Sequence, residues 1–156
     1  MENKYFIFQI FIRPIVDYNI VIYFPRTKFL LKLLEKVQRK FTKRICPCGL
    51  TYEQRLVLLS GMSVEKGYKI RTLTIMYRIM FCGLHIDGFN YQLLSSATRG
   101  SAYKINIPFC KSNLRKSFPL LRHIALLNSL KPQTSDLSSL SAFRHFLNEN
   151  VHEAQA

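Results

Sequence analysis

The sequence predicts a mainly α-helical fold, and three observations support this prediction. Between residues 29 and 45, apolar side chains recur at helical spacing, and basic side chains lie roughly opposite. Thr51 and Gln54 have the spacing of a capping box, the reciprocal pair of bonds that starts many helices. Ser63 and Gly83 bracket a longer segment as a helix cap and a C-terminal glycine. The length of 156 residues fits one domain, or one piece of a larger protein.

The N-terminal segment is apolar. Residues Tyr5 to Phe24 are rich in Phe, Ile, Val and Tyr, which suits either a strand or a short buried helix. A membrane span here would have to bury Arg13 and Asp17 and would break at Pro14, so it is a poor transmembrane candidate. The apolar run is short and no small-residue cleavage site follows, so we expect no signal peptide. The sequence thus predicts an intracellular protein, in the cytoplasm or nucleus, with reduced thiols.

The strongest helical pattern follows Pro25. Its apolar face is expected to pack in the core. "CPCG" at 46–49 ends the helix, because Pro47 cannot continue it and Gly49 tolerates a left-handed turn. The apolar face consists of Phe29, Leu30, Leu33, Leu34, Val37, Phe41 and Ile45. The basic face consists of Lys28, Lys32, Lys36, Arg39 and Lys43, with Lys40 and Arg44 at its borders.

Two more helices are predicted next. The capping box starts a short helix through Leu59, and Gly61 stops it. The segment from Ser63 to about Cys82 is apolar over much of its circumference, so we expect it to be buried. The chain then becomes polar, basic and aromatic, and no acidic residue occurs between Asp87 and Asp136.

The last third of the chain is predicted to be less regular. We expect a loop, a short strand near Tyr103 to Ile107, a second basic segment, and a helix around Leu120 to Leu130. "KPQTSDLSS" at 131–139 has the composition of a linker. The inner face of a last helix is marked by Leu140, Phe143 and Leu147.

The charge of the chain favours a polyanionic partner. Its 23 Lys and Arg against nine acidic residues give a formal charge of +14, which fits nucleic acid or an anionic membrane surface. The second basic segment interleaves cations with aromatic rings, the mixture that binds phosphates and stacks on unpaired bases. This segment favours nucleic acid, and neither a membrane nor a small-molecule ligand is expected. Its members are Arg99, Tyr103, Lys104, Phe109, Lys111, Arg115, Lys116, Phe118 and Arg122.

Metal and catalytic sites are not expected. Thiolates and imidazole suit zinc, and the candidate ligands are Cys46, Cys48, Cys82 and His85. Their C-x-C spacing lacks the usual two-to-four-residue gap, and a thiol at the end of a buried helix is an ordinary small apolar group. No Asp-Asp pair is present to hold two magnesium ions, and no Gly-rich phosphate loop occurs. No catalytic residue or cofactor is therefore assigned.

Six short motifs follow one another along the chain. They are "FIRPIVDYNIVIY" (11–23), "LLEKVQRKFTKRI" (33–45), "LTYEQRLVLL" (50–59), "TIMYRIMFCGLHID" (74–87), "TRGSAYKI" (98–105) and "SNLRKSF…R…NSL" (112–130). Their order resembles the region after the polymerase core in reverse transcriptases of jockey-like non-LTR retrotransposons (LINEs). Each motif alone is weakly specific, whereas six in this order are a strong resemblance. It covers about residues 11 to 147, nearly the whole chain.

The resemblance implies a thumb-and-connection region that helps to hold RNA template and primed DNA. It divides the chain into an apolar junction with the end of the palm (1–25), a helical thumb-like region (26–88), a basic and aromatic connection (89–132), and a linker with a C-terminal helix (133–156). The palm, with the aspartates that bind magnesium, would lie upstream. This chain alone is then no enzyme, and its partners are the missing palm and RNA and DNA of any sequence.

The expected nucleic-acid contacts combine the resemblance with the basic pattern. The apolar face of 29–45 should pack in the thumb core, and the basic face should contact nucleic acid. The predicted contact residues are Lys32, Lys36, Arg39, Lys43, Arg99, Lys104, Arg115 and Lys116.

The chain departs from the family pattern near its end. The family usually has a Trp-Asn-Ser-Leu-Pro run, where this chain has Leu127 in place of Trp and Lys131 before Pro132. The family also tends to carry Trp near Tyr23, whereas this chain has no Trp. A truncated or decayed copy would show such losses. The alternative is an independent basic helical protein that binds nucleic acid or a partner protein without enzymatic activity.

Overall fold

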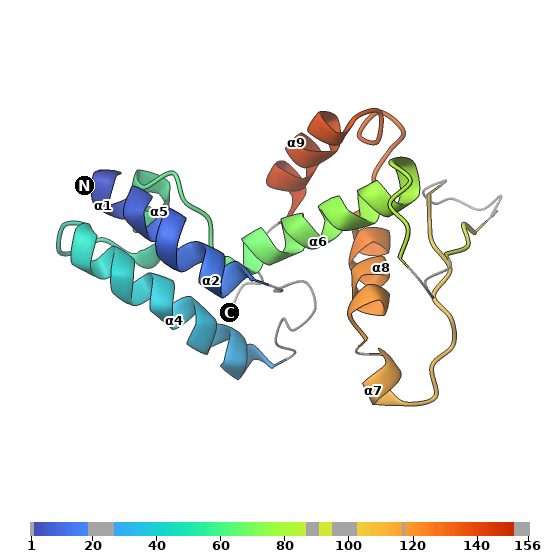
Figure 1. Cartoon of the computed structure of the whole chain (residues 1–156), viewed down its shortest axis with the longest axis horizontal. Helices are drawn as coiled ribbons and strands as arrows, with labels where there is room; N and C mark the ends of the chain where they lie inside the picture. The colour runs from blue at the N-terminus through green and yellow to red at the C-terminus, as the bar shows by residue number, and fades with distance from the viewer. Residues whose placement is uncertain (1, 19–26, 87–90, 95–102, 117, 152–156) are drawn as a thin grey trace. The chain divides into compact units, whose positions relative to one another are not determined.

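A computed structural model describes residues 2–18, 27–86, 91–94, 103–116 and 118–151 of the chain. These residues are mainly helical and contain no β-strand, which confirms the predicted mainly α fold class (Figure 1). No helix among them is long and apolar enough to cross a lipid bilayer.

The chain divides into two compact units. The first consists mainly of Met1–Tyr68, and the second consists of Lys69–His152. The boundary falls within α6 (Val64–Phe81). The division that the resemblance implies, at residues 25, 88 and 132, stays a prediction.

The first unit begins with a helix. Its helices are α1 (Glu2–Ile7), the π-helical η1 (Phe8–Ile12), α2 (Arg13–Asp17), α4 (Lys28–Ile45), α5 (Tyr52–Leu58) and the first residues of α6. The first three follow one another without a break, and the backbone is helical where they join. The apolar N-terminal segment is therefore helical as far as Asp17. The rest of the predicted segment, residues 19–24, lies outside the described residues.

Pro14 accounts for the π-helical turn. Proline has no N–H, and its ring clashes with the carbonyl four residues earlier in an ordinary helix. The helix widens instead, and the Arg13 N–H donates to the Phe8 carbonyl five residues back. This wider turn puts Phe8 and Arg13 on the same side, and both are buried.

Side chains cap α4 and α5. Thr27 Oγ1 accepts from the Leu30 N–H at 3.4 Å. Thr51 Oγ1 accepts from the Gln54 N–H at 3.3 Å, and Gln54 Oε1 accepts from the Thr51 N–H at 2.9 Å. The predicted capping box is confirmed. Between the two helices the chain turns at Gly49, whose φ of +95° is left-handed and favours glycine.

Both predicted ends of α6 are also confirmed. Ser63 Oγ accepts from the Lys66 N–H at 3.2 Å at the start of the helix. At its end Gly83 has a φ of +69°, and the Leu84 N–H donates to the Arg78 carbonyl at 3.1 Å. The Cys82 N–H donates to the same carbonyl at 3.0 Å, so two N–H groups converge on Arg78 where the helix ends.

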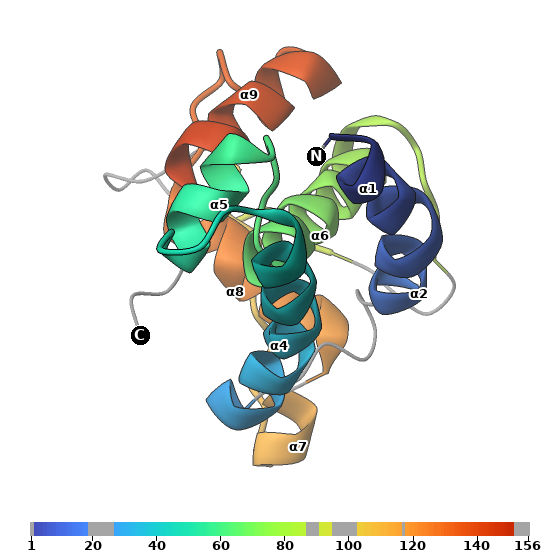
Figure 2. The same ribbon diagram turned by 90° about the vertical axis from the view of Figure 1, so that its left-hand side faces the viewer.

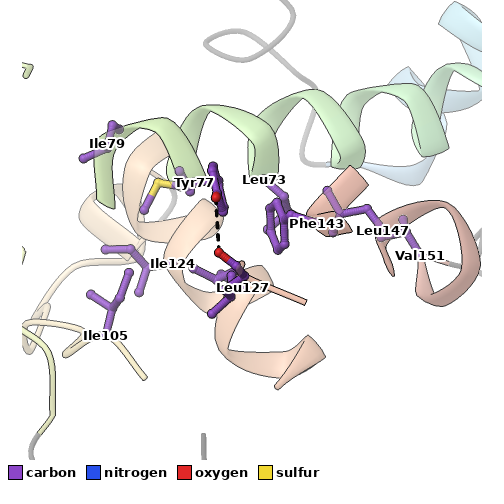
Figure 3. Packing of buried hydrophobic residues seen from close by; sticks show 11 residues of the cluster. Leu73, Tyr77, Ile79, Ile105, Ile124, Leu127, Phe143, Leu147 and Val151 are labelled. Atoms are coloured by element: carbon purple, nitrogen blue, oxygen red, sulfur yellow. Dashed lines mark hydrogen bonds between the residues drawn. The ribbon is translucent and has the colours of Figure 1, made fainter. Parts of the chain in front are cut away.

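The second unit packs helices around the buried side of α6. It adds α7 (Asn113–Lys116), α8 (Pro119–Leu130) and α9 (Leu140–Asn150). Figure 3 shows Tyr77 of α6 beside Phe143 of α9, with ring centroids 5.1 Å apart. The Tyr77 hydroxyl donates to the Leu137 carbonyl at 3.2 Å. The predicted helices near 120–130 and 140–147 are confirmed. The most buried core residues are Leu73, Met76, Ile105, Ile124, Leu127, Phe143 and Leu147.

The short strand predicted near Tyr103 to Ile107 is wrong. The described residues form only one antiparallel bridge, between Leu93 and Ile105. The Asn128 side chain occupies the peptide groups of Ile105, accepting from its N–H at 3.0 Å and donating to its carbonyl at 2.8 Å. Because a helix side chain satisfies this backbone, no further strand is needed to pair with it.

The buried side of α4 differs from the predicted one. Phe29 is 70% exposed, and Leu33 and Val37 are exposed as well. The buried positions are polar: Gln38 is 1% exposed and Thr42 is fully enclosed. The prediction that the whole apolar face packs in the core is therefore wrong. The partly buried members of that face are Leu34, Phe41 and Ile45.

Candidate nucleic-acid interface

A buried ion pair and amide hold α2 against α4. The Arg13 guanidinium pairs with Asp17 at 2.8 Å through Nε and donates to Gln38 Oε1 through Nη1. The Gln38 amide also donates to the Met62 carbonyl at 2.8 Å, and Arg13 donates to the Ser63 carbonyl at 3.4 Å. Buried polar groups need such partners, because each loses its bonds to water on folding.

A second buried carboxylate holds α4 against α5 and α6. Glu35 accepts a hydrogen bond from the Tyr52 hydroxyl. Glu35 Oε2 also accepts from the Val64 N–H, the first amide of α6, at 3.0 Å. A carboxylate is favourable there, because helix N-termini carry unpaired N–H groups and a partial positive charge. We name the buried set Arg13, Asp17, Glu35, Gln38 and Tyr52 the polar network.

The polar network was missed by sequence reasoning. Its residues come from three of the six motifs: Arg13 and Asp17 from 11–23, Glu35 and Gln38 from 33–45, and Tyr52 from 50–59. The only local signal is the four-residue spacing of Arg13 and Asp17, which suits an ion pair on one helix. The other partners lie far apart in sequence and meet only after folding.

The polar network fixes which side of α4 faces solvent. Lys32, Lys36, Arg39 and Lys43 are spaced by four, three and four residues and are all exposed. This spacing puts them along one face of the helix, as predicted. We name these four residues the basic stripe. The single acidic residue of α4, Glu35, is buried, so the exposed side carries positive charge alone.

One member of the basic stripe contacts α5. The Arg39 guanidinium carbon lies over the Tyr52 ring, 4.7 Å from its centroid. The Arg55 guanidinium carbon lies 5.9 Å from the same centroid. Figure 2 shows the connection that joins α4 to α5, the helix that carries Tyr52.

The second predicted contact segment belongs to the second unit. Lys104 is exposed, and Arg115 and Lys116 are exposed on α7. Phe109 and Phe118, which flank α7, expose 85% and 55% of their surfaces. Arg99 lies outside the described residues. The structure thus forms two candidate surfaces, the basic stripe and this second segment, one in each unit.

The candidate metal ligands do not form a described site. Cys46 is buried and Cys48 exposed in the first unit, while Cys82 and His85 are exposed in the second. Within the described ranges, no group of three or more His, Cys, Asp or Glu residues is arranged to hold a metal ion. The Asp17 carboxylate bonds Arg13, and Asp87 lies outside the described residues.

Comparison of the chain with models of protein families, with curated proteins and with solved structures finds no match. The candidate surfaces are therefore identified by their own chemistry. The exposed row of cations on α4, and the cations beside exposed rings around α7, both fit a polyanion that carries stackable bases.

Proposed function

We propose that this chain is the post-palm, C-terminal part of a jockey-like non-LTR retrotransposon reverse transcriptase. In this role it binds RNA template and primed DNA and does not itself polymerise. The observation that carries the proposal is the basic stripe, an acid-free row of four cations on the exposed side of α4. The six ordered motifs support the family, and three of them supply the polar network that orients this helix.

Binding would depend on charge and little on base sequence. Lys and Arg side chains that reach phosphates release condensed counterions, a gain that is independent of sequence. The exposed rings of Phe109 and Phe118 add stacking on unpaired bases, which every base accepts. Duplex regions offer phosphates alone, so single-stranded or partly paired nucleic acid suits both surfaces better.

The chain alone would lack polymerase activity. Phosphoryl transfer by polymerases needs metal ions held by paired carboxylates. Among the described residues, Asp17 is bonded to Arg13 and no second aspartate lies beside it. The upstream palm of the parent enzyme would supply those carboxylates and its magnesium.

An independent binding protein is the second candidate. The exposed side chains of Phe6, Phe11 and Ile15 in the first unit favour a protein partner. The coding DNA immediately upstream discriminates between the candidates. A palm with its Asp-Asp motif, in frame or frameshifted, supports the fragment, and unrelated DNA supports the independent protein.

The binding proposal is tested by fluorescence anisotropy of a labelled single-stranded oligonucleotide over a salt series. If about four phosphates are contacted, log affinity should fall against log salt with a slope near −3. Oligonucleotides of scrambled sequence should bind equally well. Binding that ignores salt, or the absence of binding at low salt, would contradict the proposal.

A further inference from the structure

We propose that Arg39 and Arg55 form a phosphate-binding site at the junction of α4 and α5. Its ligand is a backbone phosphate of single-stranded nucleic acid. The inference deepens the proposed function and rests on it, because it names the contact that anchors nucleic acid on the basic stripe. Arg55 comes from a different helix and was no part of the contact set expected from sequence.

One aromatic ring gathers the two cations. Both guanidinium carbons lie within 5.9 Å of the Tyr52 centroid. The electron-rich face of a tyrosine attracts cations, and the flat guanidinium stacks on it. The Tyr52 hydroxyl donates to buried Glu35, which fixes the ring. The site is therefore organised before any ligand arrives.

Neither cation, Arg39 or Arg55, has a close ion-pair partner in the part of the chain that the structure describes. The nearest acid in sequence, Glu53, lies two residues from Arg55, a spacing at which helical side chains do not face each other. Glu35 uses its oxygens on Tyr52 and α6. An anion bound near both guanidinium groups would offset the repulsion between their charges.

The Arg55 guanidinium is enclosed on one side only. The Arg55 Nε atom is buried and has no hydrogen-bond acceptor among the described residues. A buried donor without a partner is rare in folded proteins and costs free energy. This enclosed atom is out of reach of a ligand, so a phosphate would bind the outer nitrogens of the same guanidinium. Arg55 is only partly buried, so the outer nitrogens of its guanidinium remain within reach of solvent and ligand.

Guanidinium groups suit a phosphate ligand better than ammonium groups would. Arginine presents planar, forked donors that match two oxygens of one phosphate, whereas lysine acts as a point charge. Lys36 and Lys43 lie three residues before and four residues after Arg39 on the same face. They are placed to reach the neighbouring phosphates of a strand that passes over Arg39.

The first test changes the shape of the two side chains and keeps their positive charge. In the double variant Arg39→Lys with Arg55→Lys, affinity for a labelled single-stranded oligonucleotide should fall about tenfold, because two charge-assisted forks are lost. The salt slope should stay unchanged, because the number of cations is the same. The matched control is Arg78→Lys with Arg144→Lys, two exposed arginines of the second unit, which should bind like the parent.

A second measurement uses only the parent protein, so it can be interpreted even if the double variant folds poorly. Phenylglyoxal, which modifies arginine side chains, is added to the parent with and without oligonucleotide, and modified residues are identified by mass spectrometry. Arg39 and Arg55 should be protected by the oligonucleotide, while Arg78 and Arg144 should react equally in both samples. Unchanged modification of Arg39 and Arg55 overturns the site.

Two comparisons separate the possible failures. If inorganic phosphate protects the two arginines as well as the oligonucleotide does, the ligand is a free phosphate and the assignment to a nucleic-acid backbone is overturned. If the double lysine variant binds as tightly as the parent, this site is wrong while the proposed function stands. A parent that binds no oligonucleotide at low salt sinks the proposed function, and this site with it.

Discussion

Glu35 and Gln38 are polar residues buried on a helix that offers many apolar ones. Gln38 bonds the Arg13 guanidinium, and Glu35 accepts from Tyr52 and from the first amide of α6. A buried polar group without a partner costs about 1–3 kcal/mol, and more when it is charged. Burying Val37 instead would gain about 1.5–3 kcal/mol, but several groups would lose their partners. The polar side therefore packs inward.

This arrangement predicts opposite outcomes for two neighbouring substitutions. Gln38→Leu should destabilise the first unit by about 2–4 kcal/mol, because Arg13 stays buried with one acceptor fewer. Val37→Gln should change stability by less than about 0.5 kcal/mol, because Val37 is exposed. Urea unfolding followed by circular dichroism measures both. The apolar pattern alone predicts that Val37→Gln is the more destabilising of the two. A strongly destabilised Val37→Gln protein would therefore mean that α4 buries its apolar face.

Gly61 leaves room for a tyrosine. A Cβ atom at Gly61 would lie 2.1 Å from the Tyr5 hydroxyl oxygen. Gly61→Ala should therefore destabilise the first unit by about 1–3 kcal/mol, since the buried Tyr5 ring must shift. Adding Tyr5→Phe removes the clashing atom and should recover part of the loss in thermal unfolding. Equal stability of the single and double variants would show that the ring moves without cost.

Tyr5 also predicts a dependence on pH. Burial raises the pKa of the Tyr5 hydroxyl above its usual value of 10.0. Folding then favours the neutral phenol, so this contribution to stability is present below pH 10 and is lost as the pH rises through the folded pKa. The Tyr5→Phe protein should lose less stability than the parent in alkaline denaturation. Parallel stability curves for the two proteins would contradict this assignment.

At the scale of the element, α4 has two exposed strips of different chemistry. Lys36 and Lys43 belong to the basic stripe, whereas Leu33 and Val37 form part of an apolar strip. Both strips are free to contact other molecules, because the polar network occupies the buried side. The helix is therefore held by one set of residues and carries its charge on another, so charge can be removed without disturbing folding.

Removing two charges from α4 should change the salt dependence of binding. Lys36→Gln with Lys43→Gln should flatten the salt slope by about 1.4, since each phosphate contact on a single strand contributes about 0.7. Arg39 is left in place because it packs on Tyr52. The control with equal charge loss is Arg78→Gln with Arg144→Gln. Equal salt slopes for the two double variants would show that the basic stripe does not contact nucleic acid.

At the scale of the whole molecule, exposed apolar side chains are unevenly distributed. Among the described residues, twice as many large ones are exposed in the first unit as in the second. Many belong to α1, η1 and α2, at positions between and beside the buried Tyr5, Phe8 and Arg13. Monomeric proteins rarely expose so much contiguous apolar surface, so a partner or self-association is expected there.

This surface predicts association of the isolated chain. The triple variant Phe6→Gln, Phe11→Gln and Ile15→Gln should reduce aggregation without loss of helix, because all three side chains are exposed. Light scattering and circular dichroism are the measurements. The control Phe8→Gln should instead unfold the first unit, since Phe8 is buried and stacks on Phe41 at 4.2 Å. A monodisperse parent would show that the apolar surface causes no association.

The sequence by itself determined five of the helices, α4, α5, α6, α8 and α9, and the exposure of the predicted contact cations. Helix caps and stops act between residues a few positions apart, so a short stretch of sequence is enough to predict them. Examples are Thr51 with Gln54, Ser63 and Gly83. The seven predicted cations that are described are all exposed, because burying an unpaired charge is costly. Their contact with nucleic acid stays a prediction.

Only the tertiary structure decided which side of α4 is buried and which ring Arg39 contacts. Gln38 meets Arg13 across 25 positions, and Glu35 meets the amide of Val64 across 29. A helical pattern in the sequence shows which residues share a face of the helix. It does not show which polar groups of other segments will pack against that face. Apolar periodicity therefore named the wrong buried side. In the same way, Arg39 of α4 meets the Tyr52 ring of α5, which Arg55 also approaches, only after the chain has folded.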